Sequence, residues 1–271
     1  MSITNLISRQ IKYHFIIVIF LVPVLLTAQN SKLQKQLYEA ISKSEYLEVK
    51  KLIKQGANPN IPDRNRETAL SLLVKKPIDE ALPNIDFILK NGGTDINNKA
   101  LHKAVQLGKI PLIDFLLENG SEINPKKDSH HPLLSATKDL QVFKHLVSKG
   151  ANIHKCPIYS LFHIIQGDIS LLKYALSIGL NTNGAEDDYG RPIVHIVSFE
   201  KLEILLQYGA KVDIPLKSQY NRTLLHRAAF EDNPKRVRLL LKYGANKNAK
   251  DSFGYIPFQY AGEETKKLLQ L

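Results

Sequence analysis

The chain has 271 residues, a formal net charge of +11 at neutral pH, and 44% hydrophobic residues. That apolar share is ordinary for a folded protein and excludes an extensively disordered chain. The chain has one cysteine, Cys156, which excludes an internal disulfide, so its stability must come from side-chain packing.

The first 28 residues have the three parts of a secretory signal peptide. Residues 1–14 carry Arg9 and Lys12 and no acid, residues 15–26 are apolar, and Ala28 offers a small residue for cleavage. An uncleaved membrane anchor is the alternative, but 12 apolar residues fall short of the roughly 20 that a spanning helix needs. We therefore expect residues 1–28 to be removed. The mature chain would start near Gln29, have no stable membrane anchor, and be periplasmic or secreted.

From residue 31 onward, glycines that can end helices in a left-handed cap recur at similar intervals. They are Gly56, Gly92, Gly120, Gly150, Gly179, Gly209 and Gly244, and the intervals lie between 28 and 36 residues. Most begin a similar short sequence, such as GANPN at 56–60 and GANKN at 244–248. The polar fifth residue is expected to bond nearby backbone and hold a turn. This ladder predicts a series of similar repeats.

The clearest repeat covers residues 221–251. Thr223 can cap a first helix, Pro234 suits the first turn of a second helix, and Gly244 can end it. TLLHRAA followed by VRLLLKYGANKNAKD resembles the ankyrin repeat, whose usual form is G-x-T-P-L-H-x-A-A, then a Leu-rich helix and G-A-x-x-N. Leu224 stands where that family has proline. The resemblance covers about residues 33–271.

The resemblance implies an all-α, ankyrin-repeat solenoid of about seven to eight stacked helix-turn-helix repeats, forming one domain over residues 29–271. A single repeat cannot bury its own apolar face, so neighbours must stack. Extra residues at 77–83 predict a longer loop between the two helices of the second repeat. The fourth and sixth repeats are shortened between their helices. We expect Leu101, Leu116, Leu225 and Leu240 in the core.

The residue pattern offers no reaction centre. His102, His195 and His226 occupy the same repeat position, where the resemblance implies a bond to the backbone of a neighbouring repeat. They occur one per repeat with no thiolate or carboxylate at ligand spacing, so we expect no metal site. Asp63, Asp128, Asp187 and Asp251 open repeats and are expected to turn the chain. No phosphate-binding glycine loop or nucleophile elbow is present, so we expect no cofactor, no catalytic residue and no enzymatic activity.

The resemblance implies a scaffold that binds another protein through its concave face and loop tips. Exposed aromatic or basic residues at these positions are the candidate contacts. They are Arg64, Arg66, Lys126, Lys127, Tyr189, Tyr220, Arg227 and Tyr255. An acidic protein partner suits the positive charge. For an exported array, an immunity-type protein that holds a toxin and an effector that grips a host protein both remain open.

A different class of function also remains open. Lys126, Lys127, Arg227, Lys235, Arg236, Arg238, Lys242, Lys247 and Lys250 could form a basic patch. Because an exported protein seldom meets nucleic acid, we expect no nucleic-acid partner. The alternative is a basic envelope-surface or anion-binding structural protein without a single specific partner. Salt would separate the two classes, since charge-driven binding weakens as ionic strength rises.

Overall fold

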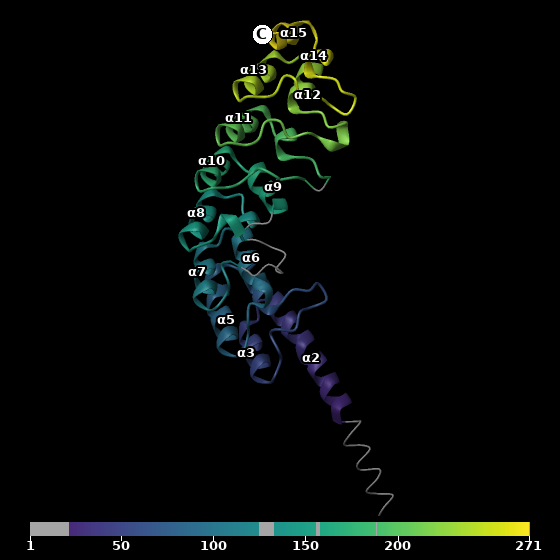
Figure 1. Ribbon diagram of the computed structural model, residues 1–271. Helices are drawn as coiled ribbons and strands as arrows, with labels where there is room; N and C mark the ends of the chain where they lie inside the picture. Colours follow the sequence, from purple (N-terminus) through teal and green to yellow (C-terminus); the bar gives the residue numbers. More distant parts are fainter. Residues whose placement is uncertain (1–21, 125–132, 156–157, 188, 271) are drawn as a thin grey trace, which may run out of the picture. The chain divides into compact units, whose positions relative to one another are not determined.

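The computed structural model describes residues 22–124, 133–155, 158–187 and 189–270. All regular elements among these residues are helices, and strand pairing among them is confined to two isolated bridges (Figure 1), which confirms the all-α class. They belong to two compact units that divide between Glu122 and Ile123. Within the described residues, no helix has both the length and the apolar character needed to cross a membrane. The single domain expected over residues 29–271 stays a prediction.

The first unit consists of helix pairs in chain order. They are α2 (Val22–Ser42) with α3 (Tyr46–Lys54), α4 (Ala69–Leu73) with α5 (Ile78–Lys90), and η2 (Ile96–Asn98) and α6 (Lys99–Gln106) with α7 (Ile110–Glu118). The first helices α2, α4 and α6 contact one another in sequence, and α3 contacts α5, so first and second helices form two layers. The helices bury apolar residues against the neighbouring pairs, so each pair relies on the stack to cover its apolar side.

The second unit repeats the arrangement. Its elements are η3 (Leu133–Ala136) with α8 (Leu140–Ser148), η4 (Ile153–Lys155), α9 (Ile158–Gln166) with α10 (Ile169–Ser177), η5 (Ile193–His195) with α11 (Phe199–Gln207), η6 (Lys217–Gln219), α12 (Leu224–Phe230) with α13 (Pro234–Lys242), and α14 (Pro257–Tyr260) with α15 (Glu263–Gln270). In the last two repeats α12 packs on α13 and α14, and α13 packs on α15. A stack of helix pairs in chain order is what the repeat pattern predicted.

The glycine ladder ends helices as expected. All seven glycines have φ between 81° and 101°, in the left-handed region. At Gly244 a Cβ would meet no atom within 4 Å, so the backbone conformation alone selects glycine there. The following N–H, from Ala245, donates to the carbonyl of Leu240 over 3.0 Å. This six-residue closure is the Schellman motif, which satisfies carbonyls that the helix end leaves without partners.

The predicted core residues are buried. Leu101, Leu225 and Leu240 are 0% exposed and Leu116 is 1% exposed. They come from first and second helices alike, so the apolar core runs between the two layers of each unit. Because each repeat contributes only a few of these leucines to the core, it depends on its neighbours to bury them.

Length differences between repeats are absorbed by helices rather than loops, contrary to our expectation. In the second repeat only residues 74–77 connect the helices, and the extra residues extend α5, which has 13 residues and includes Pro83. A proline inside a helix removes one backbone hydrogen bond, but α5 buries Ile85 and Ile88 completely. That burial offsets the lost bond. In the fourth and sixth repeats the first helix contracts to a single 3-10 turn, η3 or η5.

A ladder of side-chain amides joins consecutive repeats. Asn60 donates to the Gly92 carbonyl over 2.8 Å and accepts from the Thr94 N–H over 2.8 Å. Asn124 makes the same pair of bonds with Gly150 and Asn152. We expected this residue, four after the glycine, to hold its own turn. Instead the residue two after the glycine does so, since Asn58 accepts from the Asn60 N–H over 2.9 Å.

Several lysines are used inside the stack. Lys76 Nζ donates to the Ser42 carbonyl over 2.9 Å, Lys109 Nζ to Val74 over 2.7 Å, and Lys201 Nζ to Gly167 over 2.7 Å. Each cation therefore meets carbonyls at the end of the first helix of the preceding repeat, where the helix dipole favours positive charge. Part of the basic excess stabilises the fold and is not available to a partner.

Candidate protein-binding surface

Among the loops that lead into first helices, three share one turn, which an aspartate side chain holds. We call four of these loops finger 2 (residues 61–67), finger 6 (185–192), finger 7 (214–222) and finger 8 (249–256). In finger 8, the N–H groups of Phe253 and Tyr255 donate to Asp251 Oδ1 over 2.9 and 3.0 Å, and the Asp251 N–H donates to the Tyr255 carbonyl over 2.9 Å. Asp63 and Asp187 hold fingers 2 and 6 with the same bonds.

The turn-forming role expected of these aspartates is therefore confirmed at Asp63, Asp187 and Asp251, whereas Asp128 lies outside the described residues. The fourth residue of the turn has a left-handed backbone, with φ of 62° at Arg66 and 80° at Gly254. The turn points the residues after the aspartate outward, which places a short row of side chains at each finger tip.

In the first unit, the candidate contacts Arg64 and Arg66 lie in finger 2 and are exposed. The Arg66 carbonyl accepts a 2.7 Å bond from Lys99 Nζ, which ties this finger to the next first helix. Lys126 and Lys127 lie outside the described residues. The first unit thus contributes two exposed guanidinium groups on one finger.

In the second unit, three candidate aromatic residues lie at finger tips. Tyr189 in finger 6 is 82% exposed, Tyr220 in finger 7 is 57% exposed, and Tyr255 in finger 8 is 48% exposed. Arg227, on α12, differs from them: its Nε donates to Glu231 over 2.7 Å and its guanidinium reaches the His195 carbonyl over 3.3 Å. Its charge therefore links the sixth and seventh repeats.

Fingers 7 and 8 are locked together. The Ser252 N–H donates to the Tyr220 carbonyl over 2.8 Å, and Asn221 Nδ2 donates to Ser252 Oγ over 3.0 Å. Beneath these bonds, the Arg222 guanidinium donates to the Tyr260 hydroxyl over 3.0 Å and lies 4.4 Å from the centre of that ring. These three hydrogen bonds between the two repeats therefore fix the relative position of the two fingers.

The buried carboxylate of Asp251 is the centre of this lock. It accepts a 2.6 Å bond from the Tyr260 hydroxyl and lies 3.5 Å from Arg222 Nε, with its side chain fully covered. Burial acts to raise the pKa of Asp251, but the bonds from Tyr260, from two backbone N–H groups and from Arg222 outweigh it, so the pKa is lowered. Burial and the bond to Asp251 raise the pKa of Tyr260. Asp251 is thus a charged carboxylate that the neighbouring groups neutralise.

The lock leaves three aromatic rings exposed, and we call Tyr220, Phe253 and Tyr255 the aromatic cluster. The ring centres of Tyr220 and Phe253 are 4.8 Å apart, and those of Phe253 and Tyr255 are 6.4 Å apart. Phe253 is 56% exposed. Contiguous exposed aromatic area is uncommon on a monomer and is typical of an interaction site. In Figure 1 the loops before α12 and α14, which carry this cluster, project on the same side of the second unit.

A second surface of the same unit is basic. Lys235, Arg238 and Lys242 are exposed and lie three and four residues apart on α13, so they share one face, which we call the α13 stripe. The helix PKRVRLLLK contains no acid. Arg236, by contrast, faces Glu231 at 3.7 Å and is largely covered. The structure therefore separates the basic residues of α13 into a solvated stripe and Arg236, which is used in packing.

Two of the three histidines, His195 and His226, bond neighbouring repeats, as the family resemblance implied. His226 Nε2 lies 3.0 Å from the Tyr255 carbonyl and His195 Nε2 lies 2.7 Å from the Ile214 carbonyl. A carbonyl only accepts, so each Nε2 carries the proton and each Nδ1 is an acceptor in the neutral ring. His226 Nδ1 meets Thr223, whereas His195 Nδ1 is buried without a hydrogen-bond partner, because Pro192 occupies the threonine position.

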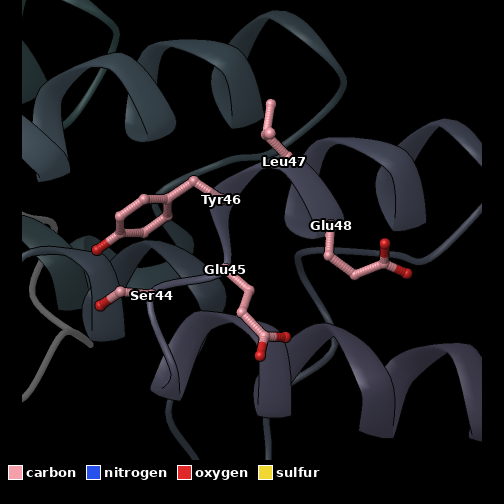
Figure 2. A pocket seen from close by; sticks show the side chains of 5 residues that line it. All are labelled: Ser44, Glu45, Tyr46, Leu47 and Glu48. Carbon is pink, nitrogen blue, oxygen red and sulfur yellow. The ribbon is translucent and has the colours of Figure 1, made fainter.

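In the part of the chain that the structure describes, we find no convergent set of ligand-binding side chains beside these surfaces. Among the residues that the structure describes, no group of histidine, cysteine, aspartate and glutamate side chains is placed to hold a metal ion. A shallow hollow lies at the turn between α2 and α3 and is lined by residues 44–48. Figure 2 shows that its side chains diverge: Tyr46, Leu47 and Glu48 point in different directions. Small-molecule sites need convergent polar groups, so this hollow does not resemble one.

Sequence reasoning named Tyr220 and Tyr255 but missed Phe253, Arg222 and Tyr260. Phe253 could have been found from the shared turn, since it follows Asp251 by two residues as Tyr189 follows Asp187. No sequence signal indicates the lock, because Arg222 and Tyr260 are 38 residues apart. Only the stacking of the repeats brings them together.

Comparisons with known proteins agree with this architecture. A family model described as ankyrin repeats in three copies matches residues 37–127 and 160–251. The chain is 32% identical over 140 residues to alpha-latroinsectotoxin-Lt1a of Latrodectus tredecimguttatus, which covers 48% of this chain and 10% of the toxin. It is 33% identical over 69 residues to a protein named as an ankyrin repeat protein of Rickettsia felis, which covers 24% of this chain and 23% of that protein. The chain spans less than a quarter of the length of each relative.

Proposed function

The chain belongs to the ankyrin repeat family, and from this premise we propose that it is an exported, non-enzymatic scaffold that binds a protein with an acidic contact surface. Ankyrin repeats generally mediate protein–protein interaction. The observation that carries the proposal is the aromatic cluster, which is exposed although the fingers beneath it are locked. Rigid tyrosine and phenylalanine side chains give large contact areas at a low entropic cost, which is why aromatics anchor many interfaces.

The acidic partner follows from the distribution of charge. In residues 214–271 the chain has eleven lysines and arginines and five acids. One of the acids, Asp251, is neutralised inside the lock. An acidic partner would be attracted to this end of the chain and oriented by it.

Export is proposed from the first 28 residues alone. The basic start, the apolar stretch at 15–26 and Ala28 support a cleaved signal peptide. Described side chains begin at Ser31, and the first buried one is Leu37, so cleavage after Ala28 would leave the described core intact. Intact-mass spectrometry of protein recovered from outside the cytoplasm should give a chain that begins at Gln29. A mass that includes residues 1–28 would contradict the proposal.

Two exported roles fit a binding scaffold: an immunity-type protein that holds a toxin, and an effector that grips a host protein. The likeness to alpha-latroinsectotoxin-Lt1a covers 10% of that toxin, so we do not carry its activity over to this chain. The source of the partner separates the two roles. A partner from the producing cell or its competitors supports the immunity-type role, and a partner from a host supports the effector role.

The test of the proposal is capture by the mature chain, residues 29–271, followed by mass spectrometry and purification of the complex. We expect a stoichiometric complex that persists at 0.5 M salt, where screening has shortened the reach of surface charge to about 4 Å. Complex formation should be lost when Tyr220 and Tyr255 are both replaced by alanine. The absence of any saturable protein partner would contradict the proposal.

The α13 stripe favours a second candidate function, a basic envelope-surface or anion-binding protein. Its three exposed cations lie on one helix face without an opposing acid on that helix. On this alternative, vesicles that contain anionic lipid would bind the chain at low salt and release it at moderate salt, because the contact is electrostatic. The double variant Lys235→Glu and Lys242→Glu would abolish this binding and leave the protein complex intact.

A further inference from the structure

We propose that the aromatic cluster recognises an extended acidic segment of the partner, with carboxylates alternating with apolar side chains. The inference rests on the proposed protein-binding function and adds the chemistry of the recognised segment. Four features of fingers 7 and 8 carry it: the spacing of the exposed rings, the sign of the surrounding charge, the saturation of the backbone donors, and the rigidity of the fingers.

The spacing of the Phe253 and Tyr255 rings is close to the repeat of an extended chain, and Tyr220 lies nearer to Phe253. Successive ring centres in the cluster are 4.8 and 6.4 Å apart. Alternate side chains of a β-strand lie on one face at intervals of about 6.6–6.8 Å. Apolar side chains at alternate positions of a partner segment could therefore contact Phe253 and Tyr255 in turn, while the intervening side chains point away from the rings.

The charge around the rings is positive. Lys217 in finger 7 and Lys250 in finger 8 are exposed, and we call these two residues the rim. Lys247 is half-buried. The only acid in residues 214–222 and 246–256 is Asp251, which is covered and bonded to Arg222 and Tyr260. A segment with carboxylates beside its apolar residues complements both the rings and the rim.

In finger 8, recognition must come from side chains rather than from strand addition. Every backbone N–H of residues 251–256 already has an acceptor: Asp251 and Gly254 bond within the turn, Ser252 bonds Tyr220, and Ile256 bonds Gln259. Phe253 and Tyr255 donate to the Asp251 carboxylate. Adding a strand needs free edge donors, so the partner backbone has no row of N–H groups to pair with in finger 8.

The fingers are already ordered before binding. Tyr220 and Asn221 both have left-handed backbones, with φ of 57° and 58°, and their bonds to Ser252 hold them there. A non-glycine residue in this region is uncommon and persists where surrounding contacts enforce it. Because the loop entropy is already lost, more of the contact energy is available for affinity.

The experiment uses a fluorescein-labelled decapeptide of alternating Glu and Leu as the probe, titrated with the full mature chain and followed by fluorescence anisotropy. Two double variants form the matched pair. Lys217→Glu with Lys250→Glu changes the finger rim, and Lys235→Glu with Lys242→Glu makes the same change of charge on the α13 stripe. Phe253→Ala tests the rings, and Phe230→Ala, at the other end of α12 and 69% exposed, is its control.

We expect the rim variant and Phe253→Ala to weaken probe binding at least tenfold, and both controls to stay within twofold of the parent chain. A decapeptide with five Glu followed by five Leu should bind at least fivefold more weakly than the alternating one. Equal losses in both double variants, or competition by a twelve-residue oligothymidylate at least as strong as by the peptide, would overturn the inference. If the natural partner is captured but is unaffected by the rim variant and by Phe253→Ala, the scaffold function stands and this inference fails. If no partner is captured while the alternating peptide still binds in this pattern, the scaffold function fails independently.

Discussion

Replacing Pro192 with threonine should stabilise the sixth repeat. His195 is 4% exposed, its Nε2–H is used on the Ile214 carbonyl, and its Nδ1 has no partner. In the next repeat the corresponding atom of His226 meets the Thr223 hydroxyl at 2.9 Å and its N–H at 3.2 Å. Pro192 has neither donor. Its backbone, with φ −58° and ψ 140°, is in the region that threonine also adopts.

The magnitude follows from two opposing effects. A buried acceptor without a partner costs about 1–3 kcal/mol, and losing the proline constraint on the unfolded chain costs about 0.4–1 kcal/mol. The net gain for Pro192→Thr should be about 1 kcal/mol. Urea denaturation would detect it as a higher midpoint, by about 0.3–1 M for ordinary slopes.

A matched variant isolates the hydroxyl. Pro192→Ala restores the N–H and loses the proline constraint in the same way, but it brings no hydroxyl. Pro192→Thr should therefore be more stable than Pro192→Ala, and the difference should vanish when His195 is replaced by alanine. Equal stabilities of the threonine and alanine variants in the presence of His195 would refute the reasoning.

Three further predictions concern the core, the pH dependence and the lock. Leu240→Ala should lower the free energy of unfolding by about 2–5 kcal/mol, since Leu240 is 0% exposed; a thermal melt showing no change would refute the assigned register. Burial, with help from the charges of Arg227 and Arg236, lowers the pKa of His195 below 6.5. The stability that neutral His195 contributes is fully present above pH 6.5, the ordinary histidine pKa, and is lost as the pH falls through the lower pKa of the folded state. Urea midpoints should therefore decline from pH 7.5 to 5.5, and the decline should be smaller in His195→Gln. Asp251→Asn should lower the melting temperature by a few degrees, because Arg222 loses its carboxylate, and it should weaken binding of the alternating peptide; an unchanged melt would show that the lock contributes little.

Local chemistry explains why much of this fold was predictable. A helix that ends at Gly56 or Gly244 does so because the left-handed cap needs glycine, and that requirement can be read from a few neighbouring residues. The turn at Asp251 is equally local, since the bonds that form it join residues no more than four apart in the chain. Repetition of these short signals gave the number and order of the helix pairs.

The second repeat shows where local reading failed. Pro77 and Pro83 suggested a loop, because proline usually interrupts helices. The neighbouring helix α3 contacts α5, in which Ile85 and Ile88 are fully buried. This packing stabilises the segment as a helix. The Asn60 side chain was misread for a similar reason, since its partners belong to the next repeat.

The sequence by itself determined that this protein is a row of helix pairs ended by glycine caps and opened by aspartate turns, because those features depend on contacts within a few residues. Only the tertiary structure decided which exposed residues act together. Arg222, Asp251 and Tyr260 meet because two repeats stack, and their meeting holds Tyr220, Phe253 and Tyr255 as one surface. Contacts across about 30 residues depend on the geometry of stacking, which no short stretch of sequence contains.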